Sequence, residues 1–554
     1  MLLFFFCVIN KMYYFCGQNT YDMRRFLFLT LGFCVLALSV QAAPPLRFLN
    51  PMNVSEGTQP IMSHRVPVFP EGGYCASQSL IGEGNYLQHS GSPRILTILA
   101  GFQDLGFTVN DPVQAFSQYL NGDTQVDLGN MNQLNIASVR QYFEISSHGQ
   151  FSPQFDIVGP VTLPQKMRYY GGSNRNGSDE NFYAFCQDAV GQVKDLVNDW
   201  SVYDNDSDGR IELVCVIFAG YGQNQGGADS AMWAKASYMN QKLNDSLLIT
   251  RFNCCCELFN PSKSDKYDYS QYINGTGVFI HEFSHCMGLP DLYATTSRAY
   301  VNNQGMESWS IMDYGLYNCN GFAPSAYTAW EQEVMGWTEI EPIDSTQVTT
   351  ITMLPLIEGG KAYKFVNSNN DCDYIVMENI QKRGLNTYSN GHGMLVYHVD
   401  YPYPSVKMND SPNNTPGHPS VAVVPAGGLL ISSFLRGSGR QYSSKEWKES
   451  IASSPFPGTG NVTELYDQMQ LPNYCFYHDD TKISTGFRIS DISENSSLGY
   501  VDFTASYGEM SGIDNVILPQ SAPHHPVYDL QGRQIQGRLK AGVYFRQGKK
   551  VLVK

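Results

Sequence analysis

The chain of 554 residues has few basic side chains and few charges of either sign. It carries 36 Lys and Arg against 51 Asp and Glu, which gives a formal net charge of −15. Nucleic-acid-binding domains carry a basic patch or stripe, so this balance argues against a nucleic-acid partner. Beyond residue 42 the chain has no apolar run near the ~20 residues that a membrane-spanning helix needs. A hydrophobic content of 42% is typical of a well-packed globular protein.

Residues 1–42 have the order of a secretory leader. Met23-Arg24-Arg25 is a basic start, an apolar run extends to Leu38, and Val40-Gln41-Ala42 is a cleavage site of small residues. The apolar run is too short to cross a membrane, which is typical of a signal peptide. We therefore expect export, with cleavage near Ala42.

The strongest chemical signal is the stretch 281–291, His-Glu-Phe-Ser-His-Cys-Met-Gly-Leu-Pro-Asp. Positions i and i+4 share one face of a helix, so His281 and His285 can bind one metal ion. Glu282 lies beside them, close enough to act on a metal-bound water. Gly288 can end the helix in a left-handed turn that brings Asp291 back as a third ligand. Three protein ligands and one open position are typical of a catalytic zinc site.

A chance match on a charged surface helix is the alternative for this motif. The preceding residues 277–280 are apolar, which predicts a buried helix. Unpaired polar groups are costly in a buried helix, and a metal ion would supply the partner that they need. The sequence therefore predicts hydrolysis of an acyl bond, with a peptide bond as the first candidate.

A second motif, Ser310-Ile-Met312-Asp-Tyr314, follows the metal-binding stretch. We interpret it as the Met-turn of a metzincin-like domain. Met312 would form an apolar floor under the histidines, and Tyr314 would hydrogen-bond the oxyanion or cap the metal. The alternative is a buried turn without a chemical role.

An acidic loop, Asp204-Asn-Asp206-Ser-Asp208-Gly209, precedes both motifs. Carboxylates at positions 1, 3 and 5 before a glycine are the pattern of a calcium-binding loop. The glutamate expected at position 12 is absent, because Cys215 stands there. We predict a calcium loop that is not a full EF-hand, and an acidic turn between a helix and a strand is the alternative.

The predicted fold class is α+β, with a metzincin-like zinc peptidase domain, a β-sandwich-like accessory domain of short strands and a small β-rich C-terminal tail. The expected segments are a leader and signal peptide at 1–42, a pro-segment or linker at 43–93, the catalytic domain at 94–345, the accessory domain at 346–507, a linker at 508–525 and the tail at 526–554.

Taken together, the stretches 281–291, 203–209 and 309–315 resemble the immune inhibitor A family of secreted bacterial metallopeptidases. Residues 374–379 and 391–400 look like the region that follows the catalytic domain in that family. The resemblance implies a zinc endopeptidase made as a zymogen, often with bound calcium. It also implies that His281, His285 and Asp291 are zinc ligands and that Glu282 is the general base.

The tail at 526–554 is similar to the sorting tails of Bacteroidetes proteins that the type IX system exports. This similarity implies a bacterial protein that is secreted or attached to the cell surface. Cys75 is a candidate switch thiolate that would bind the zinc and keep the zymogen latent. The alternatives are an ordinary disulfide or free cysteine at Cys75, an inhibitory acidic side chain of the pro-segment, or no inhibition.

We expect a secreted zinc-dependent endopeptidase that acts on proteins or peptides through a zinc-activated water, with Glu282 as general base. The competing interpretation is a cell-surface adhesin, in which the β-rich half binds a ligand and the metal site is vestigial. A third is a peptidase of narrow specificity. The sequence indicates neither the preferred cleavage site nor the natural substrate.

Overall fold

The structure is a computed structural model that describes residues 78–508 except 123–130, 132–133, 173–177, 262–269, 271, 301–302 and 434–441, together with strands at 40–42, 527–528, 534–535, 542–546 and 549–553. Within these residues no helix is both long and apolar enough to cross a membrane. Residues 1–39 of the predicted leader, Cys75, and residues 509–525 of the linker predicted at 508–525 lie outside the described residues.

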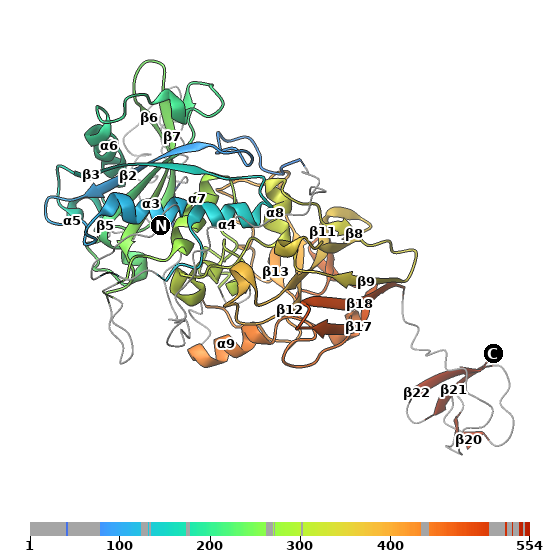
Figure 1. Cartoon of the computed structure of the whole chain (residues 1–554). Helices are drawn as coiled ribbons and strands as arrows, with labels where there is room; N and C mark the ends of the chain where they lie inside the picture. Colours follow the sequence, from blue (N-terminus) through green and yellow to red (C-terminus); the bar gives the residue numbers. More distant parts are fainter. Residues whose placement is uncertain are drawn as a thin grey trace, which may run out of the picture.

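The N-terminal half is built on a seven-stranded mixed sheet with the order β1-β6-β7-β5-β2-β3, and β4 pairs with β7 (Figure 1). Strands β3, β2, β5 and β7 run parallel, whereas β6 is antiparallel to β7 and β1 is antiparallel to β6. The strands are β1 (Val40–Ala42), β2 (Arg94–Gly101), β3 (Gln154–Thr162), β4 (Arg210–Ile211), β5 (Val214–Tyr221), β6 (Lys235–Lys242) and β7 (Leu248–Leu258).

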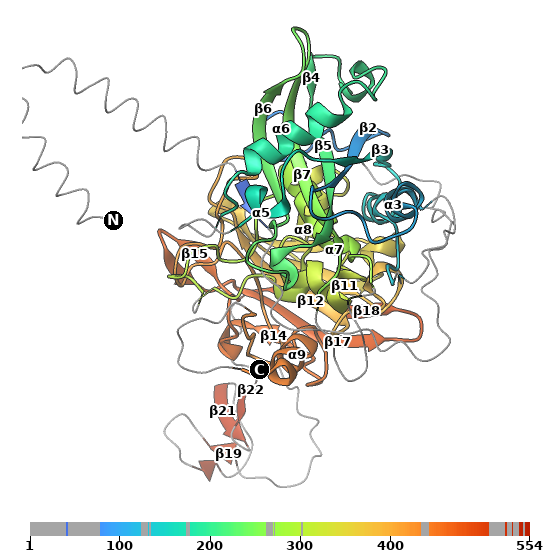
Figure 2. The same ribbon diagram turned by 90° about the vertical axis from the view of Figure 1, so that its left-hand side faces the viewer.

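The central strands are apolar along their length because helices cover both faces of the sheet. Seven of the eight residues of β2 and of β5 are buried, as expected for parallel strands in the middle of a layered α/β unit. Figure 2 shows α6 on one side of these strands and α3 on the other. Two separate core clusters agree with this, one with α3, α4 and α7 and the other with α6.

Short local signals fix the helix ends. Ser138 and Gln141 form a reciprocal capping box at the start of α4, and Thr328 and Glu331 form another at the start of α8. The α-helices are α3 (Pro112–Asn121), α4 (Val139–Ser146), α5 (Met167–Tyr170), α6 (Phe182–Val193), α7 (Thr276–Cys286), α8 (Ala329–Met335) and α9 (Ser444–Ala452). The 3-10 helices are η1 (Ser201–Tyr203), η2 (Gln223–Gln225), η4 (Glu307–Trp309), η5 (Tyr314–Gly321), η6 (Leu356–Glu358), η7 (Gly384–Asn386) and η8 (Asp467–Met469).

The second half is rich in short strands, as the sequence predicted. It has a five-stranded sheet, β13-β12-β11-β10-β8, a four-stranded sheet, β14-β17-β18-β9, and a hairpin, β15-β16. The strands are β8 (Glu341–Pro342), β9 (Thr349–Met353), β10 (Tyr363–Asn367), β11 (Asn370–Ile380), β12 (Gly393–Asp400), β13 (Val421–Val423), β14 (Leu465–Tyr466), β15 (Phe476–His478), β16 (Thr481–Ile483), β17 (Phe487–Asn495) and β18 (Tyr500–Tyr507).

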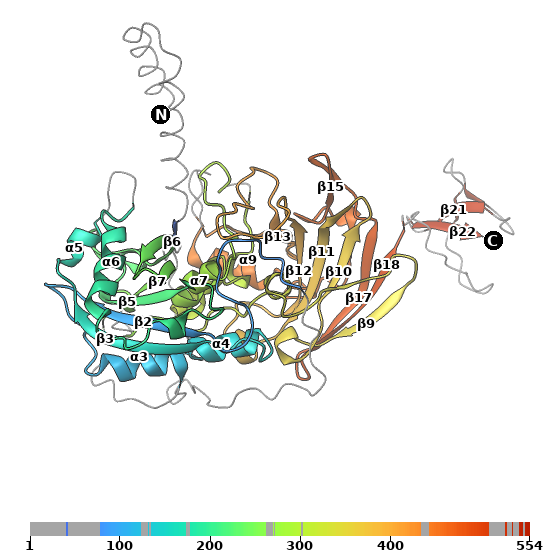
Figure 3. The same cartoon turned by 90° about the horizontal axis from the view of Figure 1, so that it is seen from above.

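The two sheets of the second half share one core, and Figure 3 shows them next to each other. Alternate residues of β18 are buried, which leaves its other face toward solvent. Phe365 from β10 stacks on Phe487 from β17 with ring centroids 4.0 Å apart. Aromatic stacking between the sheets therefore adds to the burial of their apolar faces.

The cores of the two halves are continuous across residue 345. One hydrophobic cluster contains α7 together with Tyr397 of β12, Val423 of β13 and Trp447 of α9. The second half therefore packs directly against the part of the chain that carries the predicted metal motif.

The C-terminal residues form a four-stranded sheet of their own, with the order β20-β19-β21-β22. Its strands are β19 (Val527–Tyr528), β20 (Gln534–Ile535), β21 (Gly542–Arg546) and β22 (Lys549–Val553). They lie within the segment predicted as a small β-rich tail.

Candidate metal centre

Helix α7 carries the metal motif and is buried along its whole length. Glycine at 277 allows the helix to pack against the chain that follows it, because a side chain there would clash with the Leu316 carbonyl. The helix ends at Cys286, and Gly288 has a φ of +110°, in the region that favours glycine. The chain then turns back toward the histidines, as the sequence predicted.

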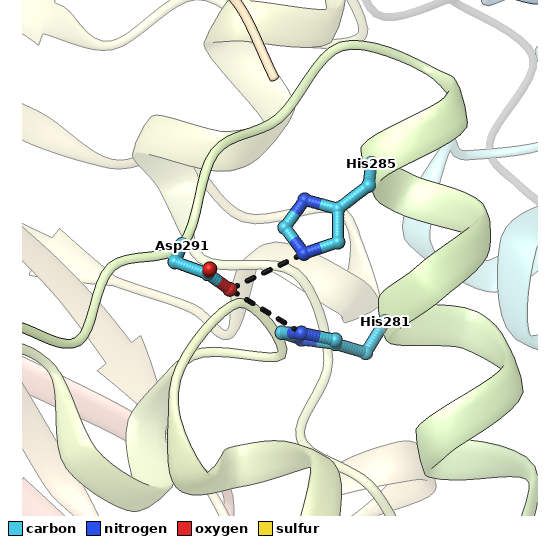
Figure 4. A group of neighbouring side chains, drawn as sticks. All are labelled: His281, His285 and Asp291. Atoms are coloured by element: carbon cyan, nitrogen blue, oxygen red, sulfur yellow. Dashed lines mark ion pairs between the residues drawn. The ribbon is translucent and has the colours of Figure 1, made fainter. Parts of the chain in front are cut away.

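His281, His285 and Asp291 point toward one another from the helix and the returning segment (Figure 4). The Asp291 Oδ1 atom lies 3.4 Å from His281 Nε2 and 3.2 Å from His285 Nε2. All three side chains are at most 2% exposed, and none of these three atoms has a hydrogen-bond partner. Tetrahedral ligands at about 2.0–2.1 Å from an ion lie roughly 3.3–3.4 Å apart, so the residues present fit zinc.

The second nitrogen of each histidine is held by a backbone carbonyl. Nδ1 of His281 lies 2.8 Å from the Ile311 oxygen, and Nδ1 of His285 lies 2.7 Å from the Leu289 oxygen. A carbonyl can only accept, so each Nδ1 donates and each Nε2 keeps a free lone pair. Burial lowers the pKa of His281, although the neighbouring Asp291 acts in the opposite direction. Because burial is the larger effect, the pKa is lowered overall, which favours the neutral form of His281 that a metal requires.

Glu282 is fully buried and joins the helix to the strand β6, which lies between β1 and β7 in the main sheet. Its Oε2 accepts a hydrogen bond of 2.6 Å from the backbone N–H of Ala236. Strand β1 pairs antiparallel with β6 at this point, with Gln41 opposite Ala236, and it also contacts α7. Extended backbone from the chain itself therefore lies beside the residue predicted to be the general base.

The predicted Met-turn at 310–314 is buried and contacts the residue that follows Asp291. The Met312 N–H donates to Ser310 Oγ over 2.9 Å, and the Met312 carbonyl accepts from the N–H of Leu292 over 2.8 Å. The ring of Tyr314 packs against Trp447, with centroids 5.3 Å apart, and against Tyr317. The structure thus brings the turn to the residue after Asp291, whereas the chemical roles of Met312 and Tyr314 stay predictions.

Tyr293 is a polar residue at the centre that the sequence analysis missed. Its side chain hydrogen-bonds Asp291 and lies close to Glu282. Burial, with the charges of those two carboxylates, raises the pKa of Tyr293, so its hydroxyl stays protonated and donates to Asp291. The sequence signal that could have identified it is its position, two residues after the predicted ligand Asp291.

The acidic loop brings four carboxylates together instead of the predicted three. Ligand atoms of Asp204, Asp206, Asp208 and Glu212 all lie within 4.8 Å of one another. Glu212 is only 6% exposed, and its Oε1 has no hydrogen-bond partner. Burial, helped by Asp206, raises the pKa of Glu212 to about 7. The sequence analysis looked for a ligand at position 12 of the loop and overlooked Glu212 at position 9.

The described cysteines, and two histidines of the β-rich half, are further side chains of the types that bind metal ions. The nine cysteines among the described residues form no disulfide, and Cys215 and Cys286 are buried. His392 pairs with Glu494, and His398 pairs with Asp373. In the part of the chain that the structure describes, only α7 with Asp291 and the acidic loop gather three or more potential metal ligands. Cys75 lies outside the described residues, so its role as a switch stays a prediction.

The candidate metal centre lies within a segment that matches a known family. Residues 92–338 match the family model of the immune inhibitor A peptidase M6 catalytic domain. This segment is an M6 peptidase domain. The resemblance inferred from the motifs at 203–209, 281–291 and 309–315 is therefore confirmed, since all three lie inside the matched residues.

Two curated proteins are similar to this chain over part of its length. It is 25% identical over 228 residues to the pre-pro-metalloprotease PrtV of Vibrio cholerae, which covers 37% of this chain and 24% of PrtV. It is 25% identical over 239 residues to immune inhibitor A of Bacillus thuringiensis subsp. alesti, which covers 38% of this chain and 34% of that protein. The match therefore spans about a quarter and a third of the two relatives.

Proposed function

We propose that this protein is a zinc-dependent endopeptidase that hydrolyses peptide bonds of proteins. The observation that carries the proposal is the convergence of three buried ligand atoms, from His281, His285 and Asp291, that have no hydrogen-bond partner. The M6 match and the metalloprotease name of the relative PrtV support the same reaction class.

Each residue of the centre has a role in this proposal. When bound, zinc serves as a Lewis acid for a water molecule and for the scissile carbonyl. Glu282 accepts the proton of the attacking water and passes it to the leaving amine. Its Oε2 keeps the hydrogen bond from Ala236 N, which holds the carboxylate beside β6. Tyr293 holds Asp291 through its hydroxyl.

The edge of β6 supports a peptide as the substrate. Three residues of the chain's own extended backbone, Val40–Ala42, pair antiparallel with Lys235–Ser237 beside Glu282. A substrate peptide could form the same backbone hydrogen bonds, which accept any sequence because they involve no side chain. This binding mode agrees with an endopeptidase that acts within a longer chain.

Metal removal tests the proposal. We expect the purified protein to contain zinc and to digest casein, to lose both on treatment with a zinc chelator, and to regain both when zinc is restored. A peptide library analysed by mass spectrometry extends the assay to a peptidase of narrow specificity. A metal-free protein that cleaves neither casein nor the library but binds a surface ligand would instead favour the adhesin.

We also propose that the loop 204–212 binds calcium, with Glu212 as a fourth carboxylate beside Asp204, Asp206 and Asp208. Oxygen ligands of this kind suit calcium, and a buried carboxylate oxygen without a partner needs a cation or a proton. The backbone N–H groups of Asp208 and Gly209 already fold the loop around Asp204 through bonds of 3.1 and 2.9 Å.

Thermal unfolding tests the calcium loop. Calcium at about a hundred times its dissociation constant stabilises a protein by about 2.7 kcal/mol, which for a chain of this length we expect to raise the Tm by roughly 2–4 °C. Glu212→Gln should lose most of this shift, while Asp371→Asn, at an exposed position outside the loop, should keep it. Equal calcium-induced Tm shifts in the wild type and in Glu212→Gln would show that Glu212 is not a calcium ligand.

We propose that the protein acts outside the cytoplasm, either secreted or at the cell surface. The proposal rests on the signal-peptide pattern of residues 23–42 and on the similarity of the C-terminal tail to type IX sorting tails.

A further inference from the structure

A buried carboxylate outside the metal motif, Glu331 at the start of α8, has more hydrogen bonds than helix capping requires. Its Oε2 accepts from Thr328 N over 2.7 Å and from Thr328 Oγ1 over 2.8 Å, which completes the capping box. Its Oε1 accepts from Ser310 Oγ over 2.5 Å and from Met312 N over 3.4 Å. The side chain is 0% exposed.

The residues bound to Oε1 form the turn that holds the metal-binding side chains. Ser310 Oγ accepts from Met312 N, so the hydroxyl links Glu331 to both ends of the turn. Between them, the Ile311 carbonyl accepts the Nδ1 proton of His281 over 2.8 Å.

The same turn reaches the third ligand from the other side. The Met312 carbonyl accepts from the N–H of Leu292 over 2.8 Å, and Leu292 directly follows Asp291. One turn therefore fixes the ring of His281 and the backbone next to Asp291. Glu331 is the side chain that fastens this turn to α8.

The chemistry of the four donors explains why a glutamate stands here. Two N–H groups and two hydroxyl groups point at the carboxylate, and an ionised carboxylate only accepts. A glutamine would place an NH2 group against either Thr328 or the Ser310–Met312 pair, where donors would face each other. Burial of a carboxylate costs several kcal/mol, and capping alone does not require it, since glutamine also completes a capping box.

We propose that Glu331 is a positioning residue of the metal centre, which sets the Ser310–Met312 turn and through it the orientation of His281 and the segment that carries Asp291. The inference rests on the proposed zinc site but not on peptidase activity. Supporting partners of this kind that do not touch the metal typically change metal affinity 10–100-fold when they are replaced.

Zinc affinity of Glu331→Gln tests the proposal, measured by competition with a chromophoric chelator. The matched control is Glu257→Gln. Glu257 is also 0% exposed and accepts from the backbone N–H groups of Thr108, Val109 and Gly220, away from the metal centre. We expect both variants to lower the Tm of the metal-free protein. Only Glu331→Gln should raise the zinc dissociation constant about 10–100-fold, with Glu257→Gln within about twofold of the wild type.

An unchanged zinc dissociation constant in Glu331→Gln, with a lowered Tm, would reduce Glu331 to a structural role and overturn the proposal. If Glu331→Gln does not fold, Ser310→Ala removes the hydroxyl link alone and should weaken zinc binding in the same direction. An unchanged affinity in Ser310→Ala would also overturn it. A wild-type protein that binds zinc and cleaves no peptide would contradict the proposed function only. The zinc affinities of the variants would still decide whether Glu331 positions the metal centre.

Discussion

Glu282→Gln is expected to bind zinc as the wild type does and to lose peptide hydrolysis by about 10²–10⁴-fold in kcat. The amide oxygen of glutamine can keep the hydrogen bond from Ala236 N, so the helix and β6 should stay in place. The amide cannot accept the proton of the attacking water. The loss should therefore fall on kcat while KM changes little, because the substrate backbone can still form hydrogen bonds with β6.

The control for this variant is Glu257→Gln, which changes a buried carboxylate of the same fold without touching the metal centre. Its kcat should stay within a few-fold of the wild type. Hydrolysis by Glu282→Gln at more than about a tenth of the wild-type kcat would show that another group takes the proton.

Asp291→Ala is expected to weaken zinc binding by more than 100-fold, beyond the ~10–100-fold typical of residues that only support a ligand. The substitution leaves two histidines, and Oδ1 of Asp291 is the atom that lies between them at 3.4 and 3.2 Å. Zinc content after gel filtration and zinc titration by competition measure the effect.

Tyr293→Phe is the graded comparison for Asp291→Ala, because it removes only the hydrogen bond to the Asp291 side chain. It should weaken zinc binding by about 10–100-fold, less than Asp291→Ala does. If Asp291→Ala kept wild-type zinc affinity, the third ligand would have to come from elsewhere in the chain.

The parts of the site that were predictable lie close together in sequence. The i, i+4 spacing of His281 and His285 fixes a shared helix face, and Gly288 marks the turn that returns the chain to Asp291. Both follow from backbone geometry within eleven consecutive residues, and the structure has the helix and the positive φ at Gly288. The mostly apolar run 95–100, between Arg94 and Gly101, is an equally local signal for a buried strand, and it forms β2.

The supporting residues were not predictable because their partners are distant in sequence. Glu331 lies 21 residues from Ser310, and Ala236 lies 46 residues from Glu282. No local pattern encodes such contacts, since they depend on how the sheet, α7 and α8 pack. Glu212 is a different case, because it lies in the loop itself, and a search not restricted to position 12 finds it.

Contacts between the two halves argue for one functional unit. Asn413, in the β-rich half, donates its side-chain amide to the Leu292 carbonyl over 2.6 Å, next to the predicted ligand Asp291. Glu307, beside the turn, accepts from Trp447 Nε1 over 3.1 Å. These buried hydrogen bonds place the β-rich half against the proposed metal centre, and we therefore expect the two halves to act as one unit.

Zinc stoichiometry and peptide hydrolysis, measured on the same preparations of the wild type and Glu282→Gln, test the central claim most directly. The account predicts about one zinc ion per chain in both proteins and hydrolysis by the wild type alone. Hydrolysis by a zinc-free wild type, or equal hydrolysis by the two zinc-loaded proteins, would contradict it.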